Sequence, residues 1–321
     1  MFRESPREPT RDGVLRAAEK IAAILPPTPL LPVEIGGVRI HVKADVLQPI
    51  GSFKIRGAWH RLTDLTPAER AAGVVAVSSG NHAQGVAWAA RKLGIAATIV
   101  MPANAPQVKL DATRALGAEV LLYDRAGGED RDLIANALCD ERGRVLVHAY
   151  ADPWVIEGQG SMGIEIAAQL GREPTRLIAC CGGGGLTAGL ALACPDAAIH
   201  PVEPEGWDDV ARSLEAGEIL RVGPDAPPTI CDAIQTPSTA PVNFAVLKAR
   251  CEAGVAVTDE EVRAAQRFAF AKLRLVVEPG GAAALAAALA GKVPLDEGTV
   301  VTLTGGNSDA DAYSAMLAAG N

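Results

Sequence analysis

Aromatic side chains are scarce in this chain of 321 residues. Phe, Trp and Tyr together make up only 4% of it, so small aliphatic side chains, mainly Ala and Val, must fill the core. Cysteine is sparse as well, because the six cysteines are scattered and none forms a C-x-x-C pair. We therefore expect reduced core thiols, and neither a disulfide framework nor a zinc site.

The chain also lacks long apolar runs and an excess of positive charge. Its alanine-rich stretch at Ala282–Ala290 is too short to span a membrane, and the charged residues 1–11 contain no apolar signal core. A net charge of −8 and a pI of about 5.3 argue against a nucleic-acid surface. We expect a cytosolic protein whose partner is a small molecule, with no nucleic acid and no membrane.

What the sequence does contain is a regular alternation of strand-like and helix-like segments. Apolar runs such as Val74–Ser78 and Ile95–Met101 precede helical stretches such as His82–Leu93. This alternation predicts parallel sheets with crossover helices, which is an α/β fold. A chain of this length, 49% of it hydrophobic, is large enough for two domains.

Four loops follow predicted strands, at the sheet edge where open α/β folds bind ligands. The first runs from Gly51 to Ala58, where Ser52 is expected to cap a helix and Lys54 to lie in its first turn. A lysine whose amine is desolvated and partly neutral can form a Schiff base with an aldehyde cofactor. From this stretch alone, a solvated surface lysine is the commoner explanation.

The other three loops have the composition of anion-binding turns. Residues 78–82 (Ser-Ser-Gly-Asn-His) form a strand-to-helix turn that can bind a carboxylate or phosphate, or can simply cap a helix. The four glycines at 182–185 allow the backbone to wrap a phosphate, although they match neither a Walker loop nor G-x-G-x-x-G. The last loop, 303–307, places the Thr304 hydroxyl at a strand end, unless it is only a turn.

Taken together and in this order, the loops resemble those of fold-type II (tryptophan synthase beta-like) pyridoxal-phosphate enzymes, in the threonine/serine dehydratase and serine racemase group. The resemblance covers about residue 15 to the end. It implies pyridoxal 5'-phosphate as cofactor, two open parallel-sheet domains and a homodimer. The large domain would comprise residues 1–68 and 148–321, and the small domain residues 69–147.

The resemblance also implies roles for individual residues. Lys54 would bind the cofactor and act as general base, with Phe53 against the ring, and Thr304 would face the pyridine nitrogen. A hydroxyl there cannot keep that nitrogen protonated, which favours β-elimination over transamination. Asn81 would meet the phenolic oxygen of the cofactor. The phosphate would lie in a cup formed by Gly182, Gly183, Gly184, Gly185 and Leu186. The substrate carboxylate would be bound by Ser78, Ser79, Asn81 and His82.

The sequence leaves the substrate open. Dehydration and deamination of L-threonine or L-serine, an amino-acid substrate in either case, is the leading hypothesis. Ser79 and Arg131 resemble instead the serine racemases and 3-hydroxyaspartate dehydratases. Ser79 could reprotonate Cα opposite Lys54, and Arg131 could reach a substrate carboxylate; the simpler explanations are a further carboxylate donor and a helix-surface arginine. Tyr150 resembles the dehydratases, whereas Ala233 departs from the glycine usual in both.

Three residues after a predicted strand resemble the divalent-cation site of the group. The ligands to Mg²⁺ or another divalent cation would be carboxylates of Glu203 and Asp209 and the backbone carbonyl of Trp207. Acidic residues in this position are more often helix N-terminal charges. Because the chain ends soon after Asn307, an attached regulatory domain is not expected.

Overall fold

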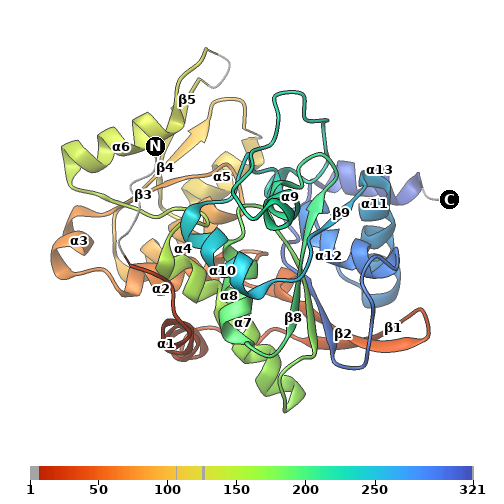
Figure 1. Ribbon diagram of the computed structural model, residues 1–321. Coiled ribbons are helices and arrows are strands. Elements are labelled where there is room, and N and C mark those ends of the chain that lie inside the picture. Colours follow the sequence, from red (N-terminus) through yellow and green to blue (C-terminus); the bar gives the residue numbers. More distant parts are fainter. Residues whose placement is uncertain (1–6, 106, 125–126, 320–321) are drawn as a thin grey trace.

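The computed structural model of the protein describes residues 7–105, 107–124 and 127–319, and it contains two sheets (Figure 1). The six-stranded sheet has the order β1-β2-β10-β7-β8-β9, and only its β1–β2 pair is antiparallel. The four-stranded sheet, β5-β4-β3-β6, is entirely parallel. The strands are β1 (Leu30–Ile35), β2 (Val38–Ala44), β3 (Val74–Val77), β4 (Ala97–Pro102), β5 (Glu119–Tyr123), β6 (Val145–Leu146), β7 (Arg176–Cys180), β8 (Ala198–Pro204), β9 (Val255–Val257) and β10 (Thr299–Leu303).

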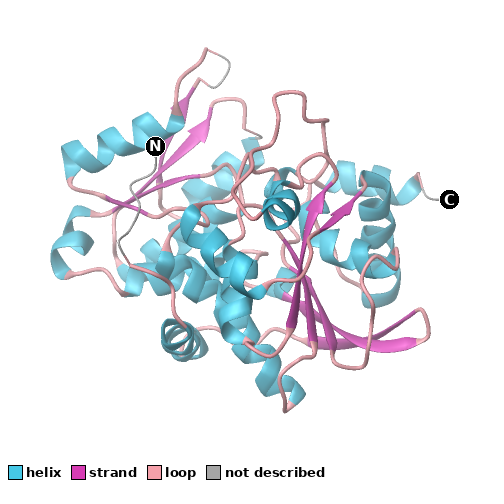
Figure 2. Ribbon diagram, in the orientation of Figure 1, coloured by secondary structure: helices cyan, strands magenta, loops and turns pink. Residues whose placement is uncertain are grey.

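Helices connect most of the parallel strands and surround the sheets (Figure 2). The α-helices are α1 (Arg11–Ala22), α2 (Lys54–Thr63), α3 (Pro67–Ala72), α4 (Asn81–Leu93), α5 (Gln107–Ala115), α6 (Arg131–Arg142), α7 (Pro153–Leu170), α8 (Gly185–Ala193), α9 (Asp209–Ala216), α10 (Pro241–Arg250), α11 (Asp259–Phe268), α12 (Pro279–Leu289) and α13 (Ala310–Ala318). Short 3₁₀ turns, η1 (Asp45–Leu47) and η2 (Asp232–Ile234), and a π-helical turn, η3 (Ala269–Leu273), complete the set. The prediction of an α/β fold with parallel sheets is confirmed.

The six-stranded sheet is packed between helices of small side chains. In Figure 1, α7 and α8 lie on one side of this sheet and α11 and α12 on the other. The side chains from Ala282 to Ala288 on α12 are all at most 1% exposed, because alanines let a helix approach a sheet closely. Four of the cysteines, Cys180, Cys181, Cys194 and Cys231, are buried among the core side chains, and the reduced state of the thiols stays a prediction.

The structure contains several elements that the sequence did not predict. The β1 strand, which pairs with β2 in a hairpin, contains Pro32, and the helices α10 and α13 lie in stretches that gave no clear signal. The four-stranded sheet uses residues between 74 and 146, and the expected domain boundary at residue 69 falls inside α3. The division at residues 69 and 147 stays a prediction. Within the described residues, no helix combines the length and the apolar character needed to cross a membrane.

Candidate functional site

The four loops meet in one cavity of about 230 Å³ between the two sheets. Its walls come from the carboxyl ends of β3 in one sheet and of β7 and β10 in the other. All of the expected cofactor and substrate residues line it, and they are Phe53, Lys54, Ser78, Ser79, Asn81, His82, Arg131, Gly182, Gly183, Gly184, Gly185, Leu186 and Thr304. Residues far apart in sequence thus converge on one space of ligand size.

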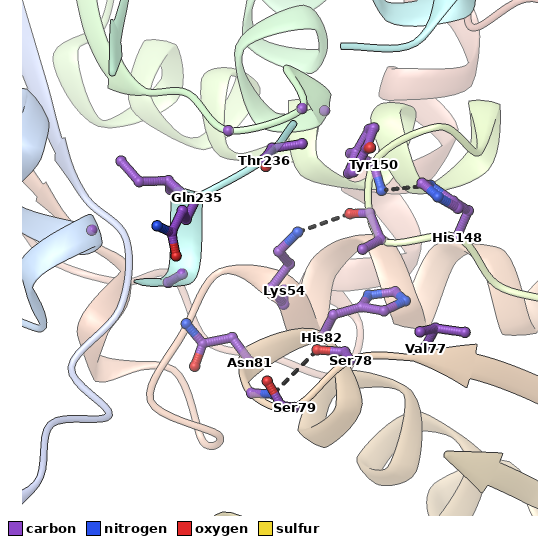
Figure 3. Close-up of a pocket in the computed structure, with 18 of the residues that line it drawn as sticks. Lys54, Val77, Ser78, Ser79, Asn81, His82, His148, Tyr150, Gln235 and Thr236 are labelled. Carbon is purple, nitrogen blue, oxygen red and sulfur yellow. Dashed lines mark hydrogen bonds between the residues drawn. The ribbon is translucent and has the colours of Figure 1, made fainter. Parts of the chain in front are cut away.

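Lys54 is the first residue of α2, and its side chain points into the cavity (Figure 3). Its Nζ donates to the carbonyl oxygen of Ala149 over 2.8 Å and lies 5.2 Å from the centre of the Phe53 ring. Burial lowers the pKa of Lys54 to about 8, although Cys180 and Glu278 act in the opposite direction. An appreciable fraction of this amine is therefore neutral near pH 7, the form that acts as nucleophile and base.

The expected N-cap at Ser52 is wrong. Phe53 occupies the cap position of α2, and no side chain caps the helix. Ser52 instead forms a bridge pair with Gly305, and the Phe53 amide donates to the carbonyl oxygen of Thr304 over 2.9 Å. Backbone pairing with the end of β10 therefore fixes this loop, and it brings Lys54 and Thr304 to the same wall.

The turn at residues 78–82 presents backbone donors to the cavity. Gly80 is the N-cap of α4 without a side-chain cap, so the first amides of the helix are available for an anion. His82 is buried, and its Nε2 lies 2.8 Å from the carbonyl oxygen of Val147. Because a carbonyl only accepts, Nε2 carries the proton; burial and then Lys54 lower the pKa of His82 to about 3. The neutral ring thus offers a substrate carboxylate no donor, because its one N–H is already bonded to Val147.

Asn81 joins two residues that the sequence did not single out. Its Nδ2 donates to Oε1 of Glu278 over 2.5 Å, and its Oδ1 accepts from Nδ2 of Asn307 over 2.7 Å. Glu278 precedes α12 as its N-cap, and burial raises its pKa to about 7. In the sequence, a glutamate before Pro279 looks like an ordinary helix start, and only the fold brings it to Asn81.

The four-glycine loop has no room for side chains. It links β7 to α8, and Gly184 has a φ of +88° in the left-handed region. A Cβ on Gly183 would lie 2.3 Å from Cδ2 of Tyr150, and one on Gly182 would lie 2.8 Å from Oγ1 of Thr236. The backbone therefore lines the cavity directly at the uncapped N-terminus of α8, which suits a phosphate group.

Two further residues complete the cavity wall. Arg131 is the first residue of α6, after the N-cap Asp130, and it is close enough to lower the pKa of His148, after burial as the main cause. Tyr150 packs edge-on against His148, and its hydroxyl donates to the carbonyl oxygen of Ser238 over 3.3 Å. Arg131 thus adds a positively charged side chain to the residues that line the cavity.

The residues expected to bind a cation are not part of this cavity. Both Glu203 oxygens accept backbone amides, from Val210 over 3.0 Å and Ala211 over 2.8 Å. Asp209 Oδ2 accepts the amide of Thr239 over 2.8 Å. Across the described part of the chain, no group of three or more His, Cys, Asp or Glu side chains could hold a metal ion. The two carboxylates are occupied as helix and loop caps.

Comparison with known proteins identifies the family. The model of the pyridoxal-phosphate dependent enzyme family matches residues 21–306. The L-threo-3-hydroxyaspartate ammonia-lyase of Pseudomonas sp is 39% identical over 314 residues, 95% of this chain and 97% of that protein. The serine racemase of Schizosaccharomyces pombe is 36% identical over 318 residues, 96% of this chain and 97% of that protein.

Solved structures agree with this assignment. The crystal structure of a threonine deaminase from T.th. superposes with a TM-score of 0.85 at 41% identity, covering 94% of this chain and 99% of that one. Maize serine racemase gives a TM-score of 0.90 at 31% identity, covering 98% of both chains. The chain therefore belongs to the family of pyridoxal-phosphate dependent enzymes.

Proposed function

We propose that the protein catalyses the β-elimination of a hydroxy amino acid with pyridoxal phosphate, releasing a 2-oxo acid and ammonia. The observation that carries the proposal is the buried Lys54 amine, which shares one cavity with the amide-rich turn 78–82 and the four-glycine loop. L-Threonine and L-serine are the leading substrates. Support comes from relatives named L-threonine ammonia-lyase in Thermotoga maritima and L-threonine dehydratase in Staphylococcus aureus.

The residues of the cavity fit pyridoxal phosphate. The glycine loop, whose Gly183 leaves no space for a Cβ, would hold the phosphate with its backbone amides and Leu186. Lys54 would hold the aldehyde carbon covalently, with Phe53 beside the ring, Asn81 at the phenolic oxygen and Thr304 at the ring nitrogen. When bound, the cofactor supplies an electron-withdrawing ring that stabilises negative charge at Cα.

The remaining chemistry belongs to the side chains and backbone of the chain. Amides of the turn 78–82, with the Ser78 and Ser79 hydroxyls, would hold the substrate carboxylate and orient the Cα–H bond toward Lys54. Once the substrate amino group has displaced Lys54 from the aldehyde carbon, the freed and neutral Lys54 amine would take the Cα proton as general base. Loss of the β-hydroxyl as water leaves an enamine, which hydrolyses to the 2-oxo acid and ammonia after release.

A second candidate substrate is 3-hydroxyaspartate, and the position of Arg131 favours it. This guanidinium lines the cavity, and an arginine can bind a second carboxylate bidentately. Two relatives similar over almost the whole chain carry the name L-threo-3-hydroxyaspartate ammonia-lyase. Racemisation of serine is the third possibility, in which Ser79 would return a proton to Cα from the face opposite Lys54.

A substrate panel tests the proposal. The purified protein is incubated with pyridoxal phosphate and with L-threonine, L-serine, D-serine or the 3-hydroxyaspartate diastereomers, and 2-oxo acid and enantiomers are measured. We expect 2-oxo acid from L-threonine or L-serine, and none from Lys54→Ala. Turnover of hydroxyaspartate alone would replace the leading substrates, and full activity of Lys54→Ala would remove Lys54 as the base.

Three finer features of the proposal concern the whole protein. A divalent cation at Glu203, Trp207 and Asp209 is supported by the burial of both carboxyls. Burial and then the nearby Asp209 raise the pKa of Glu203, so a cation would relieve the crowding of negative charge. The backbone amides already bonded to these carboxylates oppose the proposal. Homodimeric assembly is supported by the family resemblance, and a cytosolic location is proposed from the composition and charge of the chain. Bound cation should raise the melting temperature, and Glu203→Gln should abolish that rise. Analytical sedimentation measures whether the protein is a homodimer.

A further inference from the structure

Cys180 lies against the hydroxyl of Thr304 at the base of the cavity. The two residues lie at the ends of neighbouring parallel strands, β7 and β10, and each is 3% exposed. Their Sγ and Oγ1 atoms are 3.0 Å apart, and geometry allows either atom to be the donor. Both residues also line the cavity. The reaction proposed above gives Cys180 no role.

The chemistry of the two groups decides the direction of this hydrogen bond. A hydroxyl has one proton and can accept in addition, whereas thiol sulfur is a weak acceptor. Burial raises the pKa of the Cys180 thiol to about 11, so the thiol keeps its proton near pH 7. When a stronger acceptor, such as the lone pair of a pyridine nitrogen, faces Thr304, the hydroxyl proton goes to that acceptor. The S–H group then donates to Oγ1.

We propose that Cys180 is a positioning residue whose S–H donates to Thr304 Oγ1 and thereby directs the Thr304 proton toward the ring nitrogen of bound pyridoxal phosphate. This inference rests on the proposed function, in which Thr304 faces that nitrogen. A nitrogen that already accepts a hydrogen bond from Thr304 stays unprotonated. The ring is then a weaker electron sink, and expulsion of the β-hydroxyl is favoured over transfer of the amino group to the cofactor.

The competing explanation is packing, because Cys180 belongs to the large core cluster beneath the sheet. Three substitutions separate the two explanations. Cys180→Ser keeps a donor at the same position, Cys180→Val fills the space without a donor, and Cys180→Ala removes both donor and volume. Cys194→Ala is the matched control, since Cys194 is equally buried in the same cluster and its Sγ bonds to the Gly163 carbonyl, away from the cavity.

The test is spectroscopic and does not require turnover. Each variant is loaded with pyridoxal phosphate, and the absorption and fluorescence of the bound cofactor are recorded between about pH 6 and 9 without substrate. Loss of the directing hydrogen bond should raise the ratio of protonated to unprotonated ring nitrogen about twofold to tenfold, the size expected for one hydrogen bond. We expect this change in Cys180→Val and Cys180→Ala, with Cys180→Ser and Cys194→Ala resembling the unsubstituted protein.

A second comparison asks whether the effect passes through Thr304. In a Thr304→Ala background, Cys180→Val should cause no further spectral change, because the hydroxyl that it directs is absent. The proposal is overturned if Cys180→Val resembles the unsubstituted protein, if Cys180→Ser behaves like Cys180→Ala, or if Cys180→Val still acts without the Thr304 hydroxyl. Failure of the unsubstituted protein to take up the cofactor is a different result, and it would refute the proposed function instead.

Discussion

Asn81 Nδ2 donates to Glu278 Oε1 over 2.5 Å, which links the first turn of α4 to the residue before α12 at the wall of the cavity. Burial raises the pKa of Glu278 from its ordinary 4.5 to about 7. The folded protein therefore keeps this proton at pH values where the unfolded chain has lost it. The contribution of this proton to the free energy of unfolding is fully present below about pH 4.5 and is lost as the pH rises through 7. The loss amounts to about 3 kcal/mol in all.

Glu278→Gln removes the titration and keeps an oxygen that can accept from Asn81. Because only the unsubstituted protein loses stability as the pH rises, the free energy of unfolding of the variant minus that of the cofactor-free unsubstituted protein should increase by up to about 3 kcal/mol from pH 5 to pH 8. Urea denaturation at four pH values measures this difference. Glu215→Gln, at an exposed position on α9, should show no such trend. If the stabilities of Glu278→Gln and of the unsubstituted protein change with pH in the same way, the raised pKa of Glu278 is contradicted.

The contact between Asn81 and Glu278 also shows what the sequence could not reveal. The strand-then-helix alternation predicted the parallel sheets, and the polar loops at strand ends correctly pointed to one cavity. Those signals are local, because each lies within a few residues of a predicted strand end. Glu278 lies 197 residues from Asn81, and nothing in its own neighbourhood distinguishes it from a helix cap.

The errors at Ser52 and β1 have a related cause. Ser52 has the side chain of an N-cap, but pairing of its backbone with Gly305 fixes the start of α2 instead. The β1 strand contains Pro32, which weakens a strand signal, yet an edge strand tolerates proline because its outer amides need no partner. At Ser52, tertiary pairing overrides the local capping preference, and at β1 tertiary pairing forms a strand that the sequence did not predict.

Gly183→Ala should weaken cofactor binding. The added Cβ would lie 2.3 Å from the Tyr150 ring, so the ring or the loop must move, and the Tyr150 hydroxyl also bonds to Ser238. Overpacking of this kind costs about 1–3 kcal/mol, or roughly 5- to 150-fold in the dissociation constant of pyridoxal phosphate. A fluorescence titration measures it. Gly223→Ala, where no atom lies within 4 Å of the new Cβ, is the control, and equal affinities for both variants would contradict the expectation.

Arg131→Gln should separate the two substrate candidates. If the guanidinium binds the second carboxylate of 3-hydroxyaspartate, its loss should lower kcat/KM for that substrate by about 10- to 150-fold, the cost of a charged hydrogen bond. The value for L-threonine, which has no second carboxylate, should change less than about threefold. Arg142→Gln at the other end of α6, where Arg142 is half exposed, should affect neither substrate. An equal loss of kcat/KM for both substrates would show that Arg131 supports the structure of the cavity and does not recognise the second carboxylate.

A buried ion-pair network anchors the helix that carries Lys54. Arg56 on α2 donates through Nε to Asp45 Oδ2 over 2.6 Å and through Nη2 to Oδ1 over 2.9 Å. Its Nη1 donates to Glu165 over 2.9 Å, and the Arg56 and Asp45 side chains are both 0% exposed. Burial alone would raise the pKa of Asp45, but Arg56 outweighs it and the pKa is lowered. The stability that the ionised Asp45 contributes is therefore present above the ordinary pKa of an aspartate, and it is lost as the pH falls through the lowered pKa of Asp45.

Asp45→Asn should therefore destabilise the protein by about 3–5 kcal/mol at pH 7, because it leaves the Arg56 charge buried and only partly paired. Replacing both partners, as Asp45→Leu with Arg56→Met, should cost less than the sum of the single changes, since no unpaired charge remains. Urea denaturation of the four proteins measures the coupling. Asp111→Asn breaks the exposed pair with Arg114 and should cost less than about 1 kcal/mol. If Asp45→Asn costs no more than that, the start of α2 is held by its backbone pairing with β10 alone.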